Sequence, residues 1–145
     1  MRTSRKAVGA WGENAAAEYM QQKGYRITGR NVRTRYGEID LIACQERGQE
    51  PAQFSSTNHE DEVIVFVEVK TRRSTSFGFP EAAVNRKKQA HLVAAVQAYL
   101  QANPELVGAW RVDVIAVEQH GKDEPVQITH FENAITSEGF EPPGD

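Results

Sequence analysis

Residues 62–72 constrain the fold most strongly, because they combine the pattern of a buried strand with three charged groups. The run EVIVFVEVKTR is rich in β-branched residues, and a strand this apolar belongs in the interior of a sheet. Side chains alternate along a strand, so Glu68, Lys70 and Arg72 lie on a single face that begins with apolar residues. Unpaired charges are costly in a sheet interior, so these groups require partners, a metal ion or water. We therefore expect the functional site at this end of the strand.

The composition indicates a globular protein. The chain has 145 residues, of which 39% are hydrophobic and 26% charged, as is ordinary for a soluble domain. Its single cysteine, Cys44, excludes an internal disulfide and a cysteine-rich zinc site. The sequence contains no run of the ~20 apolar residues that a membrane span needs, and the apolar stretch behind the basic first residues is too short for a signal peptide. We expect a cytoplasmic protein without membrane contact, with one domain over residues 1–136 and a flexible tail over 137–145.

Charge is distributed unevenly along the chain. The formal net charge of −3 does not by itself indicate a nucleic-acid-binding protein. Residues 22–35 nonetheless carry five basic groups and no acid, and residues 69–103 carry six basic groups and one acid. Residues 104–145 hold nine acids against two basic groups. The protein can therefore present a basic surface, although solvated polar faces would explain the same pattern.

Helical and strand periodicities alternate along the sequence. Apolar residues at helical spacing predict a helix over residues 9–23 and a second over 86–102. The predicted strands cover residues 25–34, 38–44, 62–72, 110–117 and 126–131. The polar stretch 45–61 is predicted to be a long, mobile hairpin connection, and residues 74–80 a loop. This order predicts an α/β fold with a mixed central sheet flanked by helices.

The predicted strand before the long connection also carries acids at positions where core residues are expected. Strict alternation places Glu38, Asp40 and Ile42 on one face of this strand and Ile39 and Leu41 on the other. If it pairs with the following strand as a hairpin, the acids of both strands face the same small space. This coincidence is a stronger signal than either strand alone.

Asp40 and Glu68 are the strongest candidates for a metal site. Two close carboxylates repel each other unless a cation lies between them, and hard cations such as Mg²⁺, or Mn²⁺ in its place, prefer oxygen ligands. Such a cation activates water and offsets the charge that develops on a phosphate. Lys70 lies on the same predicted face as Glu68, where it could orient or deprotonate the water, and Arg72 could grip a neighbouring phosphate. The pattern therefore favours phosphodiester hydrolysis.

The remaining ionisable residues give weaker signals. Glu13 lies at the margin of the apolar stripe of the first predicted helix and could reach over a sheet edge, but its pattern alone favours a solvated glutamate near a helix N-terminus. The histidines lack metal-ligand spacing and are interpreted as surface or capping residues. These are His59, His91, His120 and His130. Asp113 is interpreted as structural, although it could face the site from the sheet edge, and Cys44 is interpreted as a small core residue.

Five segments of the sequence resemble the motifs of one known family. They are Gly12-Glu13 ahead of alanines, GEIDLI at 37–42, FVEVKTR at 66–72, Lys88-Gln89, and RVDVI at 111–115. Over residues 11–134 the chain resembles the YraN-like family of predicted endonucleases, within the PD-(D/E)XK superfamily that includes restriction enzymes and archaeal Holliday-junction resolvases. The proline of the superfamily motif is absent, because Ile39 precedes Asp40.

The resemblance implies a restriction-endonuclease-like, three-layer fold and metal-dependent cleavage of DNA, with branched or damaged DNA as candidate substrates. Asp40 and Glu68 would hold Mg²⁺ or Mn²⁺, Lys70 would be the catalytic lysine, and Glu13 an auxiliary catalytic acid. The expected substrate contacts are Arg72, Lys88 and Gln89. Related resolvases act as dimers, so a homodimer is one option.

Two alternatives to cleavage stay open. The first is a module on the same fold that binds nucleic acid without cutting it. The second is a protein-interaction domain in which Glu68, Lys70 and Arg72 merely pair with Glu13 and Glu38. Salt-dependent DNA binding and metal-dependent stability would separate these alternatives.

Overall fold

The computed structural model describes residues 5–46, 62–72, 86–121 and 123–136. Its elements are α1 (Arg5–Gln22), β1 (Arg26–Thr34), β2 (Gly37–Glu46), β3 (Glu62–Arg72), α2 (Arg86–Ala102), β4 (Trp110–Glu118) and β5 (Gln127–Ile135). This is the order predicted from the sequence, although α1 begins four residues earlier than expected and β5 runs four residues further. Most of the predicted connection at 45–61, the predicted loop at 74–80 and the predicted tail at 137–145 lie outside the described residues.

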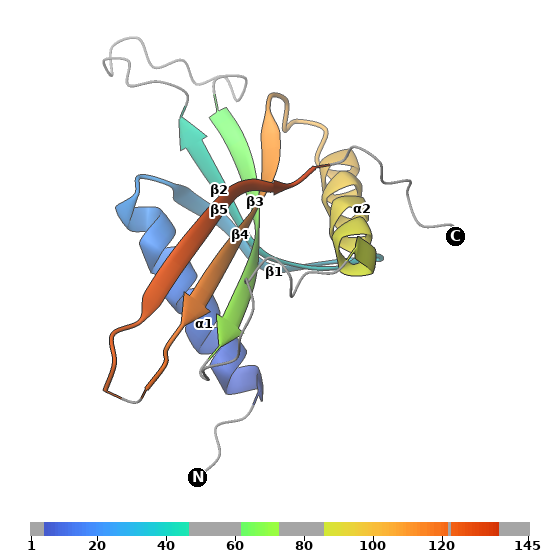
Figure 1. The fold of residues 1–145 in the computed structure, drawn as a ribbon. Coiled ribbons are helices and arrows are strands. Elements are labelled where there is room, and N and C mark those ends of the chain that lie inside the picture. Colours follow the sequence, from blue (N-terminus) through green and yellow to red (C-terminus); the bar gives the residue numbers. More distant parts are fainter. Residues whose placement is uncertain (1–4, 47–61, 73–85, 122, 137–145) are drawn as a thin grey trace, which may run out of the picture.

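The five strands form one mixed sheet in the order β1-β2-β3-β4-β5. All neighbouring strands are antiparallel except β3 and β4, which run parallel with Phe66 opposite Val112. A parallel pair requires the chain to cross from one end of the sheet to the other, and α2 lies within that crossover. The two helices lie on opposite sides of the sheet (Figure 1), which is the predicted α/β architecture.

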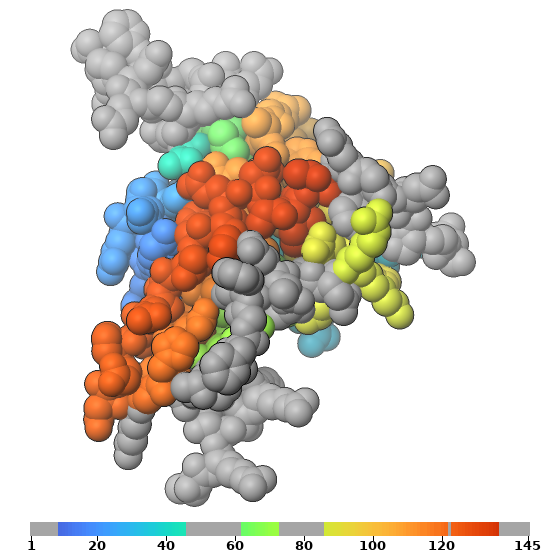
Figure 2. All heavy atoms as spheres, viewed as in Figure 1, coloured from blue at the N-terminus to red at the C-terminus, as the bar shows by residue number. Residues whose placement is uncertain are grey.

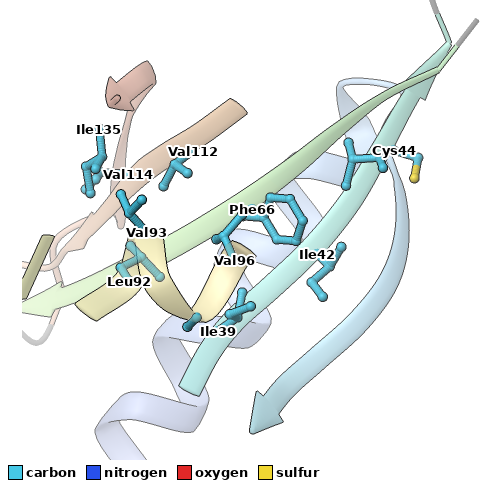
Figure 3. Close-up of a cluster of buried hydrophobic side chains, with 12 residues drawn as sticks. Ile39, Ile42, Cys44, Phe66, Leu92, Val93, Val96, Val112, Val114 and Ile135 are labelled. Carbon is cyan, nitrogen blue, oxygen red and sulfur yellow. The ribbon is translucent and has the colours of Figure 1, made fainter. Parts of the chain in front are cut away.

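Each face of the sheet carries its own apolar core. On the α2 side, Phe66 lies among side chains of β2, β4, β5 and α2 (Figure 3). On the α1 side, Val65, Val67 and Ile115 pack against Ala17 and Met20 of the helix. Burying each large aliphatic or aromatic side chain contributes roughly 1.5–3 kcal/mol, so both layers stabilise the sheet. The predicted core role of Cys44 is confirmed, since it is buried in the α2-side cluster.

The predicted alternation holds along β3 but fails in β2. In β3, Ile64 and Phe66 belong to the α2-side core and Val65 and Val67 to the α1-side core. In β2, Ile39 joins the α2-side core, although strict alternation assigns it to the opposite face. The prediction for Ile39 is therefore wrong. The break coincides with Asp40, where the ladder between β2 and β3 ends.

Both outer strands are irregular. The register of β1 against β2 shifts between Ile27 and Gly29, and that of β5 against β4 shifts between Val112 and Val114. Each outer strand also contains an asparagine with a backbone φ of 50°, Asn31 in β1 and Asn133 in β5. Asparagine adopts this left-handed conformation more readily than most residues. Figure 2 shows β5 as an exposed strip across one face of the molecule.

Neither described helix has the length and apolar character that crossing a membrane requires.

Candidate metal and catalytic site

The candidate site lies where β2 separates from β3. The last ladder pair towards the start of β2 is Leu41 opposite Val67. One residue further on, the Asp40 side chain takes the place of a backbone acceptor of β2. Its Oδ2 accepts a hydrogen bond of 2.8 Å from the backbone N–H of Val69. Because this bond satisfies a main-chain donor of β3, it fixes Asp40 against that strand, next to Glu68. The two predicted acids therefore meet, as the hairpin pairing required.

The surroundings of Asp40 are strongly negative. Burial, followed by the charge of the neighbouring Glu68, raises the pKa of Asp40 to about 7, although the Val69 N–H acts in the opposite direction. Glu13 raises it further, and the Asp40 and Glu68 carboxyl groups are also hydrogen-bonded to each other. A carboxyl group that holds its proton this strongly is one that lacks sufficient positive charge. The acid pair is thus poised to gain stability from a bound cation.

Two lysines face this acid pair from different elements. Lys70 Nζ lies 3.4 Å from Glu68 Oε1, and each of these side chains is only 16% exposed. A hydrogen bond with Lys70, together with burial, lowers the pKa of Lys88, which projects from the first turn of α2. The crossover helix α2 therefore adds the Lys88 amine to the Lys70 amine, which the sequence had predicted from β3. Lys88 was expected to bind substrate, and the structure places it beside Lys70 and Glu68.

Glu13 is carried to the site by a close approach of α1 to β3. The preceding residue, Gly12, is buried against Thr71, and a Cβ at this position would overlap the Thr71 side chain. Burial raises the pKa of Glu13, a hydrogen bond from the side chain of Asn31 lowers it, and Glu38 and Glu68 act to raise it again. Since Glu13 also raises the pKa of Asp40, it belongs to the same electrostatic cluster. This is the position expected of an auxiliary acid.

The donor set of this cluster suits a hard divalent cation. The oxygen atoms of Asp40 and Glu68 are the ligands that Mg²⁺ and Mn²⁺ prefer, and Mg²⁺ commonly keeps several waters while binding one or two carboxylates. Within the described parts of the chain, no three His, Cys, Asp or Glu side chains form a ready-made metal cage. Any ion held here would therefore complete its coordination with water or substrate oxygen. The two acids fit such an ion.

For the other two residues expected to contact substrate, Arg72 and Gln89, the structure gives a position within the fold. Arg72 ends β3, and its backbone carbonyl accepts a hydrogen bond of 2.9 Å from the N–H of Gln119. Gln89 is half-buried on α2, next to Lys88. Their roles towards a substrate stay predictions.

A cavity of about 160 Å³ opens beside Glu68. Its described walls come from Tyr36 in the turn between β1 and β2, from the first two residues of β2, from Glu68, and from α2. The α2 lining residues are Lys88, His91, Leu92 and Ala95. Figure 1 shows the β1–β2 hairpin curling towards the start of α2, which brings these walls together. The sequence did not predict this cavity, because its walls are joined only by tertiary packing.

A second polar cluster is buried on the α1 side of the sheet. Asp113 is fully buried, and its carboxylate accepts hydrogen bonds from Arg111 Nε at 3.0 Å and from the N–H of Asn133 at 2.9 Å. His130 Nε2 lies 2.7 Å from Asp113 Oδ2, and Arg111 Nη2 donates to the Tyr25 hydroxyl at 2.6 Å. Burial acts to raise the pKa of Asp113, but the bonds from His130 and Arg111 outweigh it and hold that pKa below its usual range.

This cluster supports the structural interpretation of Asp113 and corrects that of one histidine. His130 is not a surface residue: its side chain is 8% exposed and it contacts Asp113 and Tyr19. The same cluster connects the irregular part of β5 to β4, because the backbone N–H of Asn133 in β5 donates a hydrogen bond to Asp113 in β4. The two clusters differ in their electrostatics, because the partners of Asp113 lower its pKa whereas the surroundings of Asp40 raise its pKa.

Sequence reasoning also missed Asn31, which hydrogen-bonds Glu13. It lies between the Arg30–Leu41 and Val32–Ile39 pairs of β1 and β2, and thus opposite Asp40. Its φ of 50° is unusual within a strand. An asparagine inside an arginine-rich strand pattern is a weak signal for such a role, because the same residue is common at turns.

The comparisons with known proteins assign the chain to a family. The model of "Uncharacterised protein family UPF0102" matches residues 12–117, which include the four residues Glu13, Asp40, Glu68 and Lys70. The chain is similar to a "UPF0102 protein" of Syntrophomonas wolfei, with 42% identity over 90% of this chain and 98% of the relative. It is also similar to one of Syntrophotalea carbinolica, with 36% identity over 97% of this chain and 100% of the relative. A third, from Alkaliphilus oremlandii, is 40% identical over 90% of this chain and 98% of the relative. The protein therefore belongs to the UPF0102 family, the YraN-like family that its motifs resemble.

Proposed function

We propose that this protein is a metal-dependent endonuclease of the PD-(D/E)XK superfamily that hydrolyses phosphodiester bonds in DNA. The observation that carries the proposal is the meeting of Asp40 and Glu68 at the point where β2 leaves β3, with Lys70 Nζ 3.4 Å from Glu68. Two half-buried acids that repel each other destabilise the fold, and a cation bound between them offsets that repulsion. Branched or damaged DNA is the proposed substrate.

The side chains can divide the work of hydrolysis. Asp40 and Glu68 would hold Mg²⁺ or Mn²⁺, which, when bound, activates water and offsets phosphate charge. Lys70 is placed to orient the attacking water through a hydrogen bond and to stabilise the anionic transition state. Glu13 adds negative charge on the side of Asp40 and would orient further water molecules. Lys88 gives a second ammonium group for a phosphate that flanks the cleaved bond.

Basic residues on neighbouring elements support a polyanionic substrate. Arg33 of β1 is largely exposed, and Arg35 lies in the turn between β1 and β2 that borders the cavity. Arg86, Lys87 and Lys88 occupy the first turn of α2, where the helix N-terminus also favours an anion. The net charge of −3 is thus compatible with a locally basic surface around the acids.

The test is cleavage of DNA by the purified protein with Mg²⁺ or Mn²⁺, using linear, mismatched and branched substrates. Lys70→Ala should lower the rate by a factor of about 10²–10⁴, the usual contribution of a catalytic acid or base. Lys23 is an exposed lysine directly after α1, and Lys23→Ala is the matched control, which should cut like the wild type.

Two results would overturn the proposal. One is that no DNA structure is cut with either metal, and the other is that Lys70→Ala cuts as fast as the wild type. DNA binding that persists in Asp40→Asn with EDTA, and falls steeply with salt, would then identify a binding module instead. If neither metal nor DNA changes the melting temperature, the protein-interaction alternative gains support.

A further inference from the structure

The cavity beside Glu68 has the chemistry of a site for a flat, neutral ring. Its floor is apolar, since Leu92 and Ala95 are buried members of α2 and Tyr36 packs against the same core. Its rim is polar and carries Glu38, Glu68, Lys88 and His91. Two carboxylates against one lysine disfavour a phosphate inside the cavity. The floor and the rim together suit a group with an apolar face and hydrogen-bonding edges.

The size of the cavity agrees with that chemistry. Its volume of about 160 Å³ is similar to that of an engineered protein cavity of roughly 150 Å³ that binds benzene. One six-membered ring therefore fits, as in a pyrimidine or the six-membered half of a purine. The ring of Tyr36 already makes a cation–π contact, because the Arg35 guanidinium carbon lies 4.8 Å from the ring centroid. Aromatic rings and guanidinium planes are the surfaces on which unpaired bases stack.

We propose that this cavity receives the base of an unpaired nucleotide whose phosphate lies at the Asp40–Glu68 pair. The inference rests on the proposed function and specifies its substrate class: DNA with an unpaired nucleotide at the cleavage position, as in a bulge, a single-stranded end or a branch. Glu68 connects the two sites, because it is both a member of the acid pair and a wall of the cavity. A base inside a continuous duplex is stacked and paired, so it cannot enter without leaving the helix.

The experiment measures binding separately from cleavage. Three duplexes are compared in EDTA at low salt: one fully paired, one with a single unpaired nucleotide, and one with an abasic site at that position. Fluorescence anisotropy of the wild-type protein should show tighter binding of the unpaired nucleotide than of the abasic site by about fivefold to a hundredfold, as expected for one stacked base. An unpaired 2-aminopurine at the same position should lose fluorescence on binding, because stacking quenches it.

Variants of Tyr36 assign the effect to the cavity. Tyr36→Ala should bring the ratio of the two affinities close to one, whereas Tyr36→Phe keeps the ring and should keep the ratio. His120→Ala is the control, because His120 is an exposed histidine that pairs with Glu118 and is not among the described lining residues. The 2-aminopurine measurement uses the wild type, so it does not depend on the folding of any variant.

The outcomes separate this inference from the proposed function. Metal-dependent cleavage with equal affinity for the unpaired and abasic duplexes overturns the inference and leaves the nuclease standing. A preference that Tyr36→Ala retains also overturns it. Absence of binding to all three duplexes overturns the inference, and cleavage with Mg²⁺ or Mn²⁺ still decides the proposed function. A Tyr36-dependent preference in a protein that cuts nothing supports the cavity assignment and contradicts the nuclease.

Discussion

The raised pKa of Asp40 predicts that removing this charge stabilises the metal-free protein. Asp40→Asn keeps an oxygen that can accept the hydrogen bond from Val69 N–H, and it removes the repulsion between Asp40 and Glu68. The folded protein holds the Asp40 proton up to a pH of about 7, whereas the unfolded chain releases it near the usual value of 3.8. The stabilisation from holding that proton is therefore complete below pH 4 and lost as the pH rises through 7.

The magnitude follows from these two values. A tenfold difference in proton affinity corresponds to about 1.4 kcal/mol, so the interval from 3.8 to about 7 corresponds to at most about 4 kcal/mol. Relaxation of the site reduces this, and we expect the asparagine variant to be more stable than the wild type by about 2–4 kcal/mol at pH 8. Near pH 4 the two proteins should differ by less than about 1 kcal/mol, the usual scale of a neutral surface change.

The assay is urea unfolding in EDTA at several pH values between 4 and 8, followed by circular dichroism. Asp113→Asn is the matched control, because Asp113 is a second strand carboxylate whose pKa is lowered, by His130 and Arg111, instead of raised. That variant should lose about 3 kcal/mol at pH 8, and the loss should stay nearly constant down to pH 4, because the pKa of Asp113 lies below its usual value of 3.8. If Asp40→Asn is no more stable than the wild type at pH 8, or if its advantage does not grow with pH, the electrostatic account of the site is wrong.

Three further outcomes are expected. Gly12→Ala should destabilise the protein by about 1–3 kcal/mol, because the added Cβ would overlap the Thr71 side chain. Gly9→Ala is the control: no atom lies near its added Cβ, so it should stabilise α1 by up to ~1 kcal/mol. Thermal unfolding compares the two variants. Mn²⁺ at a hundredfold excess over its dissociation constant should stabilise the wild type by about 2.7 kcal/mol, and Glu68→Gln should abolish most of that gain in a thermal-shift titration; an equal gain in both proteins would contradict the metal site. Tyr25→Phe removes the 2.6 Å hydrogen bond from Arg111 and should cost about 1–2 kcal/mol in urea unfolding, and a neutral result would show that the bond adds no stability.

The residues of the site could be predicted from the sequence, but the local backbone geometry that brings them together could not. Charged residues inside an apolar strand are a local signal, so Glu68 and Lys70 could be singled out without knowing any contact. The change of side at Ile39 could not be predicted, because it follows from a carboxylate of Asp40 replacing a rung of the ladder to β3. Period-two alternation assumes an unbroken ladder on both sides of the strand.

Long-range contacts account for the other differences. His130 appeared as an isolated histidine, since its partner Asp113 lies 17 positions away and its partner Tyr19 111 positions away. The position of Glu13 depends on Gly12 meeting Thr71, which requires the helix and the strand to be already packed together. Contacts between residues so far apart leave no periodic pattern in the sequence. Only the resemblance to a family motif can indicate them. The order of elements is local information, and that order was predicted correctly.

The irregular outer strands affect how copies of this protein could associate. An exposed strand that is straight and regular offers a row of free N–H and C=O groups on which another chain can build a continuous sheet. Here the register shift near Gly29 in β1, the one opposite Val112 in β5, and the left-handed asparagines Asn31 and Asn133 interrupt that row on both borders. Growth of the sheet from one molecule into the next is thereby disfavoured. These edges therefore favour a two-fold dimer that joins through side-chain surfaces and keeps the two sheets separate.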